Sequence, residues 1–389
     1  MYKITPIIIL FLLPLFIFIL LSPTLSASTR IRPEKIDYKC LKVKFNNEPL
    51  DIFYIVIDTR TDEEKQADRK RGHLSGSVIV FFHGHAQRPN NGFNLLAEMA
   101  MKTKSGIIII PVCDTPYGSN EKWRGDSGKM VILMELVRYL LHEKKISIEG
   151  YQPLTDLKLV INNTDLSVLS MDTIINAKIL AVGYSHGGII SRQFANAYPD
   201  AVVSLVHFCA AGYIEWGGKN CIGPVCITGN FMCESCNIGL RFFSHPGDTI
   251  DSSWGLTKGI VGDSLRSYSS CLFGNFNCLK PFRNFRDAKD ASIYIDDSNY
   301  PVSHLKNIVV VFAQDDTLFD PAEIIGVDDY KNITRKVIEE FWTKFYPQEV
   351  AGGTRLTLRI LPGTHLGPIV YHDQYIEIAL KGTDEFRLD

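Results

Sequence analysis

The sequence predicts an α/β fold in which helices cover both faces of a mostly parallel central sheet. Short apolar runs rich in β-branched residues alternate with longer amphipathic segments along most of the chain. In addition, most of these runs are apolar at nearly every position. The alternation is typical of strand-helix-strand units, and strands that are apolar throughout are typical of a parallel sheet buried on both faces.

The elements follow one another in a regular order. Residues 41–45 and 52–57 are expected to form a leading antiparallel pair, and the highly charged residues 58–71 a solvated loop. Further strands are expected at residues 77–82, 106–112, 177–183, 202–208, 308–313 and 355–361, of which all but the last are expected to be buried on both faces. Helices are expected at residues 93–102, 128–142, 186–198, 330–345 and 371–380.

Composition and charge narrow the class of protein further. Of the 389 residues, 46% are hydrophobic and 22% charged, with a formal net charge of -2. A disordered chain would carry fewer apolar residues and a larger charge imbalance. Because phosphate contacts need concentrated Lys and Arg and no basic run is present, no nucleic-acid partner is expected.

The first 28 residues differ from the rest and are interpreted as a signal peptide. Residues 7–21 are apolar except for Pro14, and small residues follow up to Ser28. Since a helix needs roughly 20 apolar residues to cross a bilayer, cleavage near Ser26 or Ser28 is favoured over a retained anchor. The protein is therefore expected to be secreted or extracytoplasmic, with membrane association through residues 7–21 as the alternative.

Residues 212–300 interrupt the alternation within a domain expected to span residues 35–389. This stretch is rich in Gly, Ser, Asn and Cys, and is interpreted as a cap or lid insertion. It holds six of the nine cysteines: Cys221, Cys226, Cys233, Cys236, Cys271 and Cys278. In an exported protein local disulfides are favoured, but four closely spaced thiolates in the Cys221–Cys278 cluster leave a zinc site open as the alternative.

The strongest motif is the G-x-S-x-G sequence from Gly183 to Gly187, centred on Ser185. It lies where a predicted strand passes into a predicted helix, which is the context that this motif requires. A tight turn there presents the serine hydroxyl alone at the carboxyl edge of the sheet. The sequence therefore predicts a nucleophilic serine at position 185.

A serine hydroxyl needs a base to take its proton and an acid to orient that base. The expected topology places the acid after a later strand and the histidine after the last one. Asp315 and Asp316 follow the strand at 308–313, and His365 follows the strand at 355–361. Both residue types thus occur where the topology requires them.

With these residues the chain resembles members of the α/β-hydrolase superfamily, in particular its lipases and esterases. The resemblance covers about residues 40–211 and 302–381. The resemblance implies an α/β-hydrolase fold with Ser185 as the nucleophile, His365 as the general base and Asp316 as the orienting carboxylate. It implies no metal and no organic cofactor.

The assignments of acid and base each have alternatives. Members of the superfamily often carry Gly-x-x-Asp after the acid's strand, and here the corresponding residues begin at Ala313 and align Asp316 as the acid. Asp315 is the second candidate and Asp320 the third. His207 and His372, which lie beside the appropriate strands, are the alternatives to His365.

The resemblance also implies an oxyanion hole built from two backbone N–H groups. One donor is assigned to His186, directly after the nucleophile. The other is assigned to His85, with Ala86 next, in the loop that begins His83-Gly84 after the strand at 77–82. The His-Gly-Gly-Gly sequence of one large esterase group is absent.

The expected function is hydrolysis of carboxylic esters, with a small-molecule or lipid ester as the partner. Three alternatives remain at this point. A serine peptidase, or a thioesterase or polyester depolymerase, would use the same three residues on the same fold. A binding module that had kept the fold but lost turnover is the alternative from a different class.

Overall fold

A computed structural model describes residues 39–45, 48–84, 93–103, 105–112, 127–152, 159–166, 175–214, 300–370 and 372–382. All of them lie in one compact unit, Ile36–Asp389. The signal segment expected at 1–28, the insertion at 212–300 apart from its first three residues and its last, and the Cys221–Cys278 cluster lie outside the described residues. The interpretations of these segments therefore stay predictions.

Ten strands of the described residues form one mixed sheet in the order β12-β11-β10-β9-β3-β4-β2-β1-β6-β7. The strands are β1 (Lys39–Phe45), β2 (Glu48–Asp58), β3 (Val78–Phe82), β4 (Ile107–Pro111), β6 (Leu159–Ile161), β7 (Thr164–Asp165), β9 (Ile179–Tyr184), β10 (Val202–Phe208), β11 (Asn307–Ala313) and β12 (Arg355–Leu361). Neighbours from β12 to β4 are parallel, and neighbours from β4 to β7 are antiparallel. The prediction of a mostly parallel sheet therefore holds for the strands from β12 to β4. The predicted antiparallel pair of β1 and β2 is confirmed.

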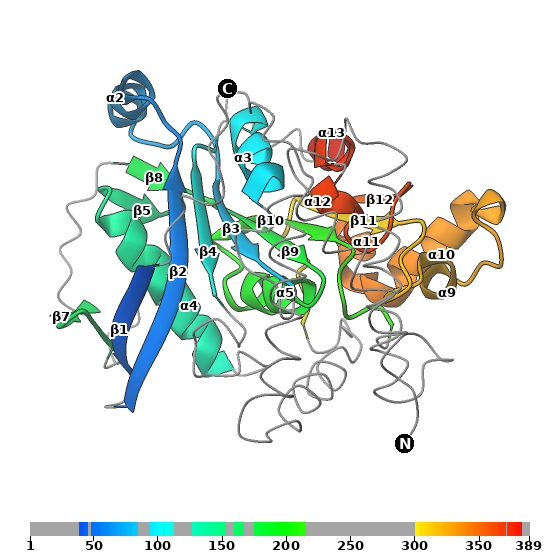
Figure 1. The fold of residues 1–389 in the computed structure, drawn as a ribbon, viewed down its shortest axis with the longest axis horizontal. Coiled ribbons are helices and arrows are strands. Elements are labelled where there is room, and N and C mark those ends of the chain that lie inside the picture. Colours follow the sequence, from blue (N-terminus) through cyan, green and yellow to red (C-terminus); the bar gives the residue numbers. More distant parts are fainter. Residues whose placement is uncertain are drawn as a thin grey trace, which may run out of the picture. The chain divides into compact units, whose positions relative to one another are not determined.

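Apolar side chains from alternate positions of each strand fill two cores, one on each face of the sheet. In β11, Ile308, Val310 and Phe312 belong to one core, and the residues between them belong to the other. The first core includes residues of α4 (Ser127–His142), α5 (Gly187–Ala197) and α10 (Arg335–Phe345). The second includes residues of α3 (Phe93–Lys102), α12 (Gly367–Val370) and α13 (His372–Gly382). Figure 1 shows these helices on opposite faces, as the sequence predicts.

Burial along the strands agrees with the pattern of the sequence. Every residue of β3, β4, β9 and β11 is buried, whereas most residues of β12, an outer strand of the sheet, are partly or fully exposed. Strands β10 and β12 and helix α3 have the predicted bounds.

Two predicted elements are divided in the structure. The run at 177–183 begins with the end of β8 (Ile175–Ala177), which pairs with β5 (Ile146–Ile148) in a separate two-stranded sheet. The segment at 330–345 contains η4 (Tyr330–Asn332) and then α10, because the Thr334 side chain accepts a hydrogen bond from the N–H of Val337 and begins a new helix there. Three short helices were not predicted: α9 (Pro321–Ile325), α11 (Pro347–Gly352) and α12.

The prediction of a loop at 58–71 is wrong, because Asp62–Arg71 forms helix α2. Thr61 and Glu64 form a capping box, and Gly72 ends the helix with φ 73°. The first turn is acidic and the last turn basic, which suits the helix dipole. The helix has no apolar face, so periodicity alone could not reveal it.

A buried ion-pair network holds α2 against the sheet. The Arg60 guanidinium pairs with Asp58 at 3.0 Å and with Asp68 at 3.0 Å, and Asp68 is fully buried. Burial of charge is tolerated here because each carboxylate has a cationic partner. Among the described residues, the helices are all too short or too polar to cross a membrane.

We expect Thr61→Ala to lower the free energy of unfolding by ~1 kcal/mol, because the Thr61 hydroxyl accepts a hydrogen bond from the N–H of Glu64 at 3.2 Å. Thr343→Ala is the control, because the Thr343 hydroxyl donates to a carbonyl, that of Glu339, at an exposed position inside α10. Urea denaturation measures both variants. Equal stability of the two would contradict the role of the capping box.

Candidate active site

Ser185 occupies a tight turn between β9 and α5. Its φ of 53° lies in the left-handed region that non-glycine residues rarely adopt. A Cβ added to Gly187 would lie 1.9 Å from the carbonyl oxygen of Phe82, and one added to Gly183 would lie 2.3 Å from Ser191 Oγ. Both glycines of the motif are therefore required by close approach, on the β3 side and on the α5 side of the turn.

Backbone hydrogen bonds fix the turn in this conformation. The Ser185 N–H donates to the carbonyl of Phe208 at 3.1 Å. The Ser185 carbonyl accepts from the N–H groups of Gly188 at 2.9 Å and Ala211 at 2.8 Å. A strained residue persists when its surroundings determine its position several times over, and such residues cluster at functional sites.

His365 connects Ser185 to Asp316. Its Nε2 lies 2.9 Å from Ser185 Oγ, and its Nδ1 lies 2.7 Å from Asp316 Oδ2. Because a carboxylate only accepts, Nδ1–H donates to Asp316 and Nε2 accepts from the serine hydroxyl. The structure thus brings together three side chains that are 180 and 49 residues apart in sequence, in the geometry that activates a serine.

Asp316 is held on both carboxylate oxygens. Oδ2 faces His365, while Oδ1 accepts from the N–H groups of Leu318 at 2.9 Å and Phe319 at 3.0 Å. Asp316 is 3% exposed, so these bonds replace the water that it loses on burial. The carboxylate is therefore fixed in position before any substrate binds.

The other two aspartates in this loop have different surroundings. Asp315 is exposed, and its backbone N–H donates to the carbonyl of Gly363 at 2.8 Å. The Asp320 side chain caps α9 by accepting from the N–H of Ala322 at 2.9 Å. Of the three candidates, Asp316 is the one whose side chain bonds to the His365 ring.

Two aromatic side chains that sequence reasoning did not identify pack against the imidazole. The rings of Tyr184 and Phe319 each lie 5.4 Å from the His365 ring, and the Tyr184 hydroxyl donates to the His365 carbonyl at 2.7 Å. Tyr184 lies one residue before Ser185 and Phe319 three residues after Asp316, but no spacing in the sequence encodes these contacts. These contacts limit rotation of the imidazole and shield its bond to Asp316 from water.

One of the two predicted oxyanion donors lies within the described residues. His186 is buried and immediately precedes α5, whose first residue, Gly187, packs against the carbonyls of Phe82 and His83. The His83 ring donates through Nδ1 to the carbonyl of Gly84 at 2.8 Å and so braces the end of β3. His85 and Ala86 lie outside the described residues, and the second donor stays a prediction.

The alternative histidines lie elsewhere in the fold. His207 is buried in β10, where Nε2 lies 3.1 Å from Ser191 Oγ. His372 is the first residue of α13. His365 is the histidine whose ring the structure brings to Ser185.

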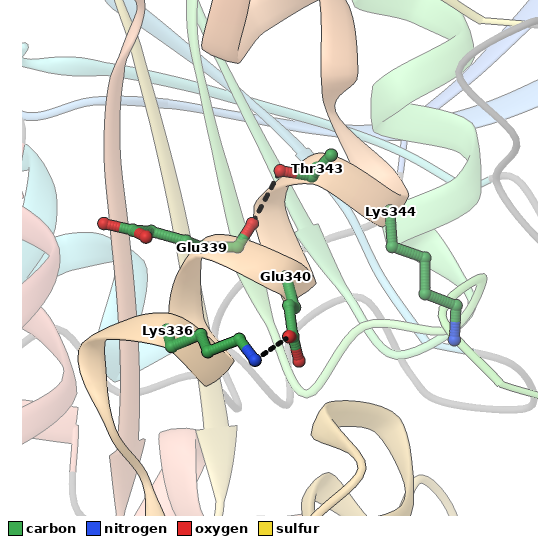
Figure 2. A pocket seen from close by; sticks show the side chains of 5 residues that line it. All are labelled: Lys336, Glu339, Glu340, Thr343 and Lys344. Carbon is green, nitrogen blue, oxygen red and sulfur yellow. Dashed lines mark hydrogen bonds and ion pairs between the residues drawn. The ribbon is translucent and has the colours of Figure 1, made fainter.

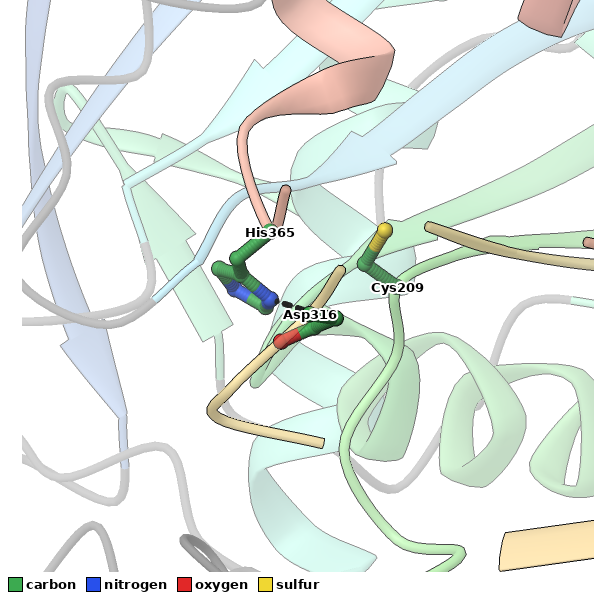
Figure 3. A group of neighbouring side chains, drawn as sticks. All are labelled: Cys209, Asp316 and His365. Carbon is green, nitrogen blue, oxygen red and sulfur yellow. Dashed lines mark hydrogen bonds and ion pairs between the residues drawn. The ribbon is translucent and has the colours of Figure 1, made fainter. Parts of the chain in front are cut away.

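Figure 3 shows Cys209 beside Asp316 and His365, a group whose donor atoms all lie within 4.8 Å of one another. This donor set is one that zinc accepts. However, two ligands of one tetrahedral zinc ion lie about 3.4 Å apart, given metal-ligand bonds of about 2.1 Å. The 2.7 Å between Nδ1 and Oδ2 is instead the length of a hydrogen bond from an imidazole N–H to a carboxylate, so the arrangement favours a hydrogen-bonded pair over metal binding.

A shallow hollow on α10 is separate from this site (Figure 2). The residues that line it all belong to one helix, and Lys336 pairs with Glu340 at 3.6 Å. The full set is Lys336, Glu339, Glu340, Thr343 and Lys344. Mixed charges at helical spacing are typical of a solvated helix face.

Comparison with family models and with curated protein sequences gives no match. Similar solved structures do exist. A membrane phospholipase A described as a bacterial virulence factor is 10% identical, with 92% of this chain and 88% of that chain covered and a TM-score of 0.48. A Pyrococcus furiosus esterase is 11% identical, with 94% of this chain and 98% of that chain covered and a TM-score of 0.45. A Pseudomonas fluorescens meta-cleavage product hydrolase is 14% identical, with 90% of this chain and 98% of that chain covered and a TM-score of 0.48.

The fold is that of an α/β hydrolase. A central parallel strand, β9, ends in the G-x-S-x-G turn and passes into a helix that packs on the sheet, which is the hallmark of this fold. The sheet is large and mixed. Identities as low as those of the similar structures carry neither a substrate nor an activity to this chain.

We expect Gly187→Ala to lower the free energy of unfolding by roughly 3 kcal/mol, because the new methyl group would collide with β3 backbone that cannot rotate away. Gly352→Ala is the matched control, since its Cβ would meet nothing nearer than Ser303 O at 3.8 Å. Urea denaturation compares the two. If Gly187→Ala proved as stable as Gly352→Ala, the close approach of β3 to the Ser185 turn would be wrong.

Proposed function

We propose that the protein is a serine hydrolase that cleaves carboxylic esters. The observation that carries this proposal is the continuous hydrogen-bonded series from Ser185 Oγ through His365 to Asp316, with distances of 2.9 and 2.7 Å. A buried carboxylate, an imidazole and a strained serine at the carboxyl edge of a sheet together form the arrangement needed for acyl transfer.

In the first half of the reaction, Ser185 Oγ attacks the acyl carbonyl carbon while His365 Nε2 takes the hydroxyl proton. The imidazolium that forms is stabilised by Asp316, which stays ionised. The carbonyl oxygen becomes an oxyanion near the amino end of α5, where the N–H of His186 is the proposed donor; removal of one such donor typically costs about 3 kcal/mol. The oxyanion then re-forms the carbonyl group as the ester C–O bond breaks, and His365 Nε2–H gives its proton to the departing oxygen, so that the alcohol leaves and the acyl group stays on Ser185 Oγ.

The second half repeats these steps with water. His365 takes a proton from a water molecule, whose oxygen attacks the acyl-serine carbonyl. The collapse of the second tetrahedral intermediate returns the proton to Ser185 Oγ and releases the carboxylic acid. No step in this scheme requires a metal ion or an organic cofactor.

The proposed substrate is a small-molecule or lipid ester, and the proposed location is outside the cytoplasm. The location is proposed from residues 1–28 alone, with residues 7–21 as a tether if they are retained. The triad geometry supports acyl transfer, which the same three groups perform on esters, thioesters and peptides. Of these, an ester is proposed from the resemblance of the G-x-S-x-G turn and its partners to lipases and esterases.

Ser185→Ala should reduce kcat for a short p-nitrophenyl ester by roughly 10⁶-fold, because the acyl-enzyme can no longer form. Release of p-nitrophenol measures the rate, and circular dichroism checks that the variant is folded. Substantial activity in the folded variant would contradict the assignment of Ser185. Hydrolysis of peptides or thioesters in preference to esters would keep the mechanism and change the substrate class.

Asp316→Asn should reduce kcat by ~10⁴-fold, because an amide at this position no longer selects the imidazole tautomer that accepts the serine proton. Asp315→Asn is the control, since the Asp315 side chain is exposed and its kcat should stay close to the wild-type value. Steady-state kinetics on the same ester compares them. The reverse order of activities would assign the role of the acid to Asp315.

A further inference from the structure

The amino end of α5 packs closely on the sheet through small residues. Besides Gly187, which lies against β3, a Cβ added to Gly188 would lie 2.3 Å from Ala210 Cβ. One added to Gly183, in β9, would lie 2.3 Å from Ser191 Oγ. Ser191 is the one polar side chain in these contacts, and it is fully buried. Its hydroxyl therefore needs hydrogen-bond partners inside the protein.

The partners of the Ser191 hydroxyl are Gly188 and His207. The hydroxyl donates to the carbonyl of Gly188 at 2.9 Å, and its oxygen lies 3.1 Å from His207 Nε2. His207 is fully buried in β10, where it is the register partner of Gly183 in the neighbouring strand β9. Ser191 thus links the helix that follows Ser185 to the strand beside it. The reaction proposed above uses neither Ser191 nor His207.

The donors in this group have one consistent order. Since Ser191 gives its proton to a carbonyl, its oxygen accepts from His207 Nε2–H. Nδ1 of the neutral imidazole then accepts from the Tyr213 hydroxyl at 2.7 Å, which in turn accepts from the Tyr346 hydroxyl at 2.6 Å. Burial, together with the charge of Arg192, lowers the pKa of His207 to about 3, so this order holds at any pH near neutrality.

Aromatic packing fixes the far end of the series. The Tyr213 ring lies 5.4 Å from that of Phe312, 5.6 Å from that of Phe341 and 5.1 Å from that of Phe345. A ring held on several sides keeps its hydroxyl aimed at His207 Nδ1. The donation from Tyr213 then selects the tautomer of His207 that carries its proton on Nε2, the one that bonds to Ser191.

Gly188 transmits this restraint to Ser185. Its carbonyl accepts from Ser191, and its N–H donates to the Ser185 carbonyl at 2.9 Å. On the other side, the Ser185 N–H donates at 3.1 Å to the carbonyl of Phe208, the residue that follows His207 in β10. The backbone of Ser185 is therefore bonded at both ends to residues next to the bond between Ser191 and His207.

Stability alone does not account for polar side chains at this place. Replacing both partners of a buried hydrogen bond by apolar groups of the same shape is often nearly neutral or stabilising. A fully satisfied buried network instead specifies one arrangement of the chain. Here that arrangement is the position of the amino end of α5 on β9 and β10. Ser185, at a φ of 53°, depends on it, because a strained residue persists only where its surroundings hold it.

We propose that Ser191 and His207 are positioning residues: by holding the amino end of α5 on β9 and β10, they orient the Ser185 hydroxyl for attack. This role rests on the proposed reaction of Ser185. Neither residue takes part in its proton transfers.

Ser191→Ala in the full chain tests the proposal, because it removes the hydroxyl between Gly188 and His207 and keeps the β-carbon that packs on Gly183. Three quantities are measured: the rate at which a fluorophosphonate labels Ser185, kcat and KM for p-nitrophenyl acetate, and the free energy of unfolding in urea.

Ser105→Ala is the matched control. Ser105 is also fully buried, and its hydroxyl also donates to backbone carbonyls, those of Ser77 and Ile107. These residues lie where β3 and β4 begin, at the edge of the sheet opposite to the one that carries Ser185. The control therefore loses a comparable buried hydroxyl far from the reacting atoms.

We expect Ser191→Ala to be labelled about tenfold more slowly than the wild type, because a small displacement of the attacking oxygen slows attack. Its kcat should fall by a similar factor while KM stays near the wild-type value, because substrate binding does not need an oriented hydroxyl. Ser105→Ala should lose stability and change neither rate.

Two substitutions of His207 separate its hydrogen bond from its volume. The side chain of His207→Gln still offers an N–H to Ser191, and this variant should be labelled at a rate close to that of the wild type. His207→Leu offers none and should behave like Ser191→Ala. If Ser191→Ala does not fold, the comparison of these two variants decides the question.

Equal labelling rates in Ser191→Ala and Ser105→Ala would overturn the positioning role, and so would equal rates in His207→Gln and His207→Leu. If the wild-type chain hydrolysed no ester but was labelled at Ser185, the proposed ester hydrolysis would fail, and the labelling rates would still decide the role of Ser191 and His207. A folded wild-type chain without any label on Ser185 would overturn both proposals.

Discussion

The close packing of the Ser185 turn between β3 and α5 is the constraint on which the rest of the site depends. Gly187 has no room for even one methyl group beside the Phe82 carbonyl, and Gly183 has none beside Ser191. Within this turn Ser185 has a φ of 53°, and α5, which follows it, packs its apolar residues into the first core. Backbone contacts therefore set the position of the Ser185 hydroxyl before any substrate binds.

The partners of Ser185 are held by the same kind of interaction. Asp316 is fixed by two backbone N–H groups, and His365 is fixed by Asp316, by the Tyr184 hydroxyl and by aromatic packing. Each group thus has its hydrogen bonds satisfied while it is almost completely buried. In the mechanism that we propose, preorganisation of this kind lets the charge on the imidazole develop without rearrangement of its surroundings.

The sequence predicted the parts of the fold whose signals are local. Apolar strands such as β10 and the Gly-x-Ser-x-Gly motif indicate burial and a tight turn directly, and chain order then led to His365 and Asp316. Helix α2 was missed because its signals are a capping box and charge placement rather than an apolar face. Tyr184 and Phe319 were missed because contact with His365 is a tertiary fact that no spacing encodes. The second oxyanion donor at His85 and the cysteine cluster lie outside the described residues and stay predictions.

The most direct test of the central claim, that His365 and Asp316 activate Ser185, is reaction of the folded chain with a fluorophosphonate followed by mass spectrometry of its tryptic peptides. Because the reagent modifies only an activated serine, the account predicts one adduct per chain, on Ser185 in the peptide spanning residues 179–192. It also predicts that His365→Ala greatly slows the reaction. A folded wild-type chain that stays unlabelled, or that is labelled at another residue, would contradict the account.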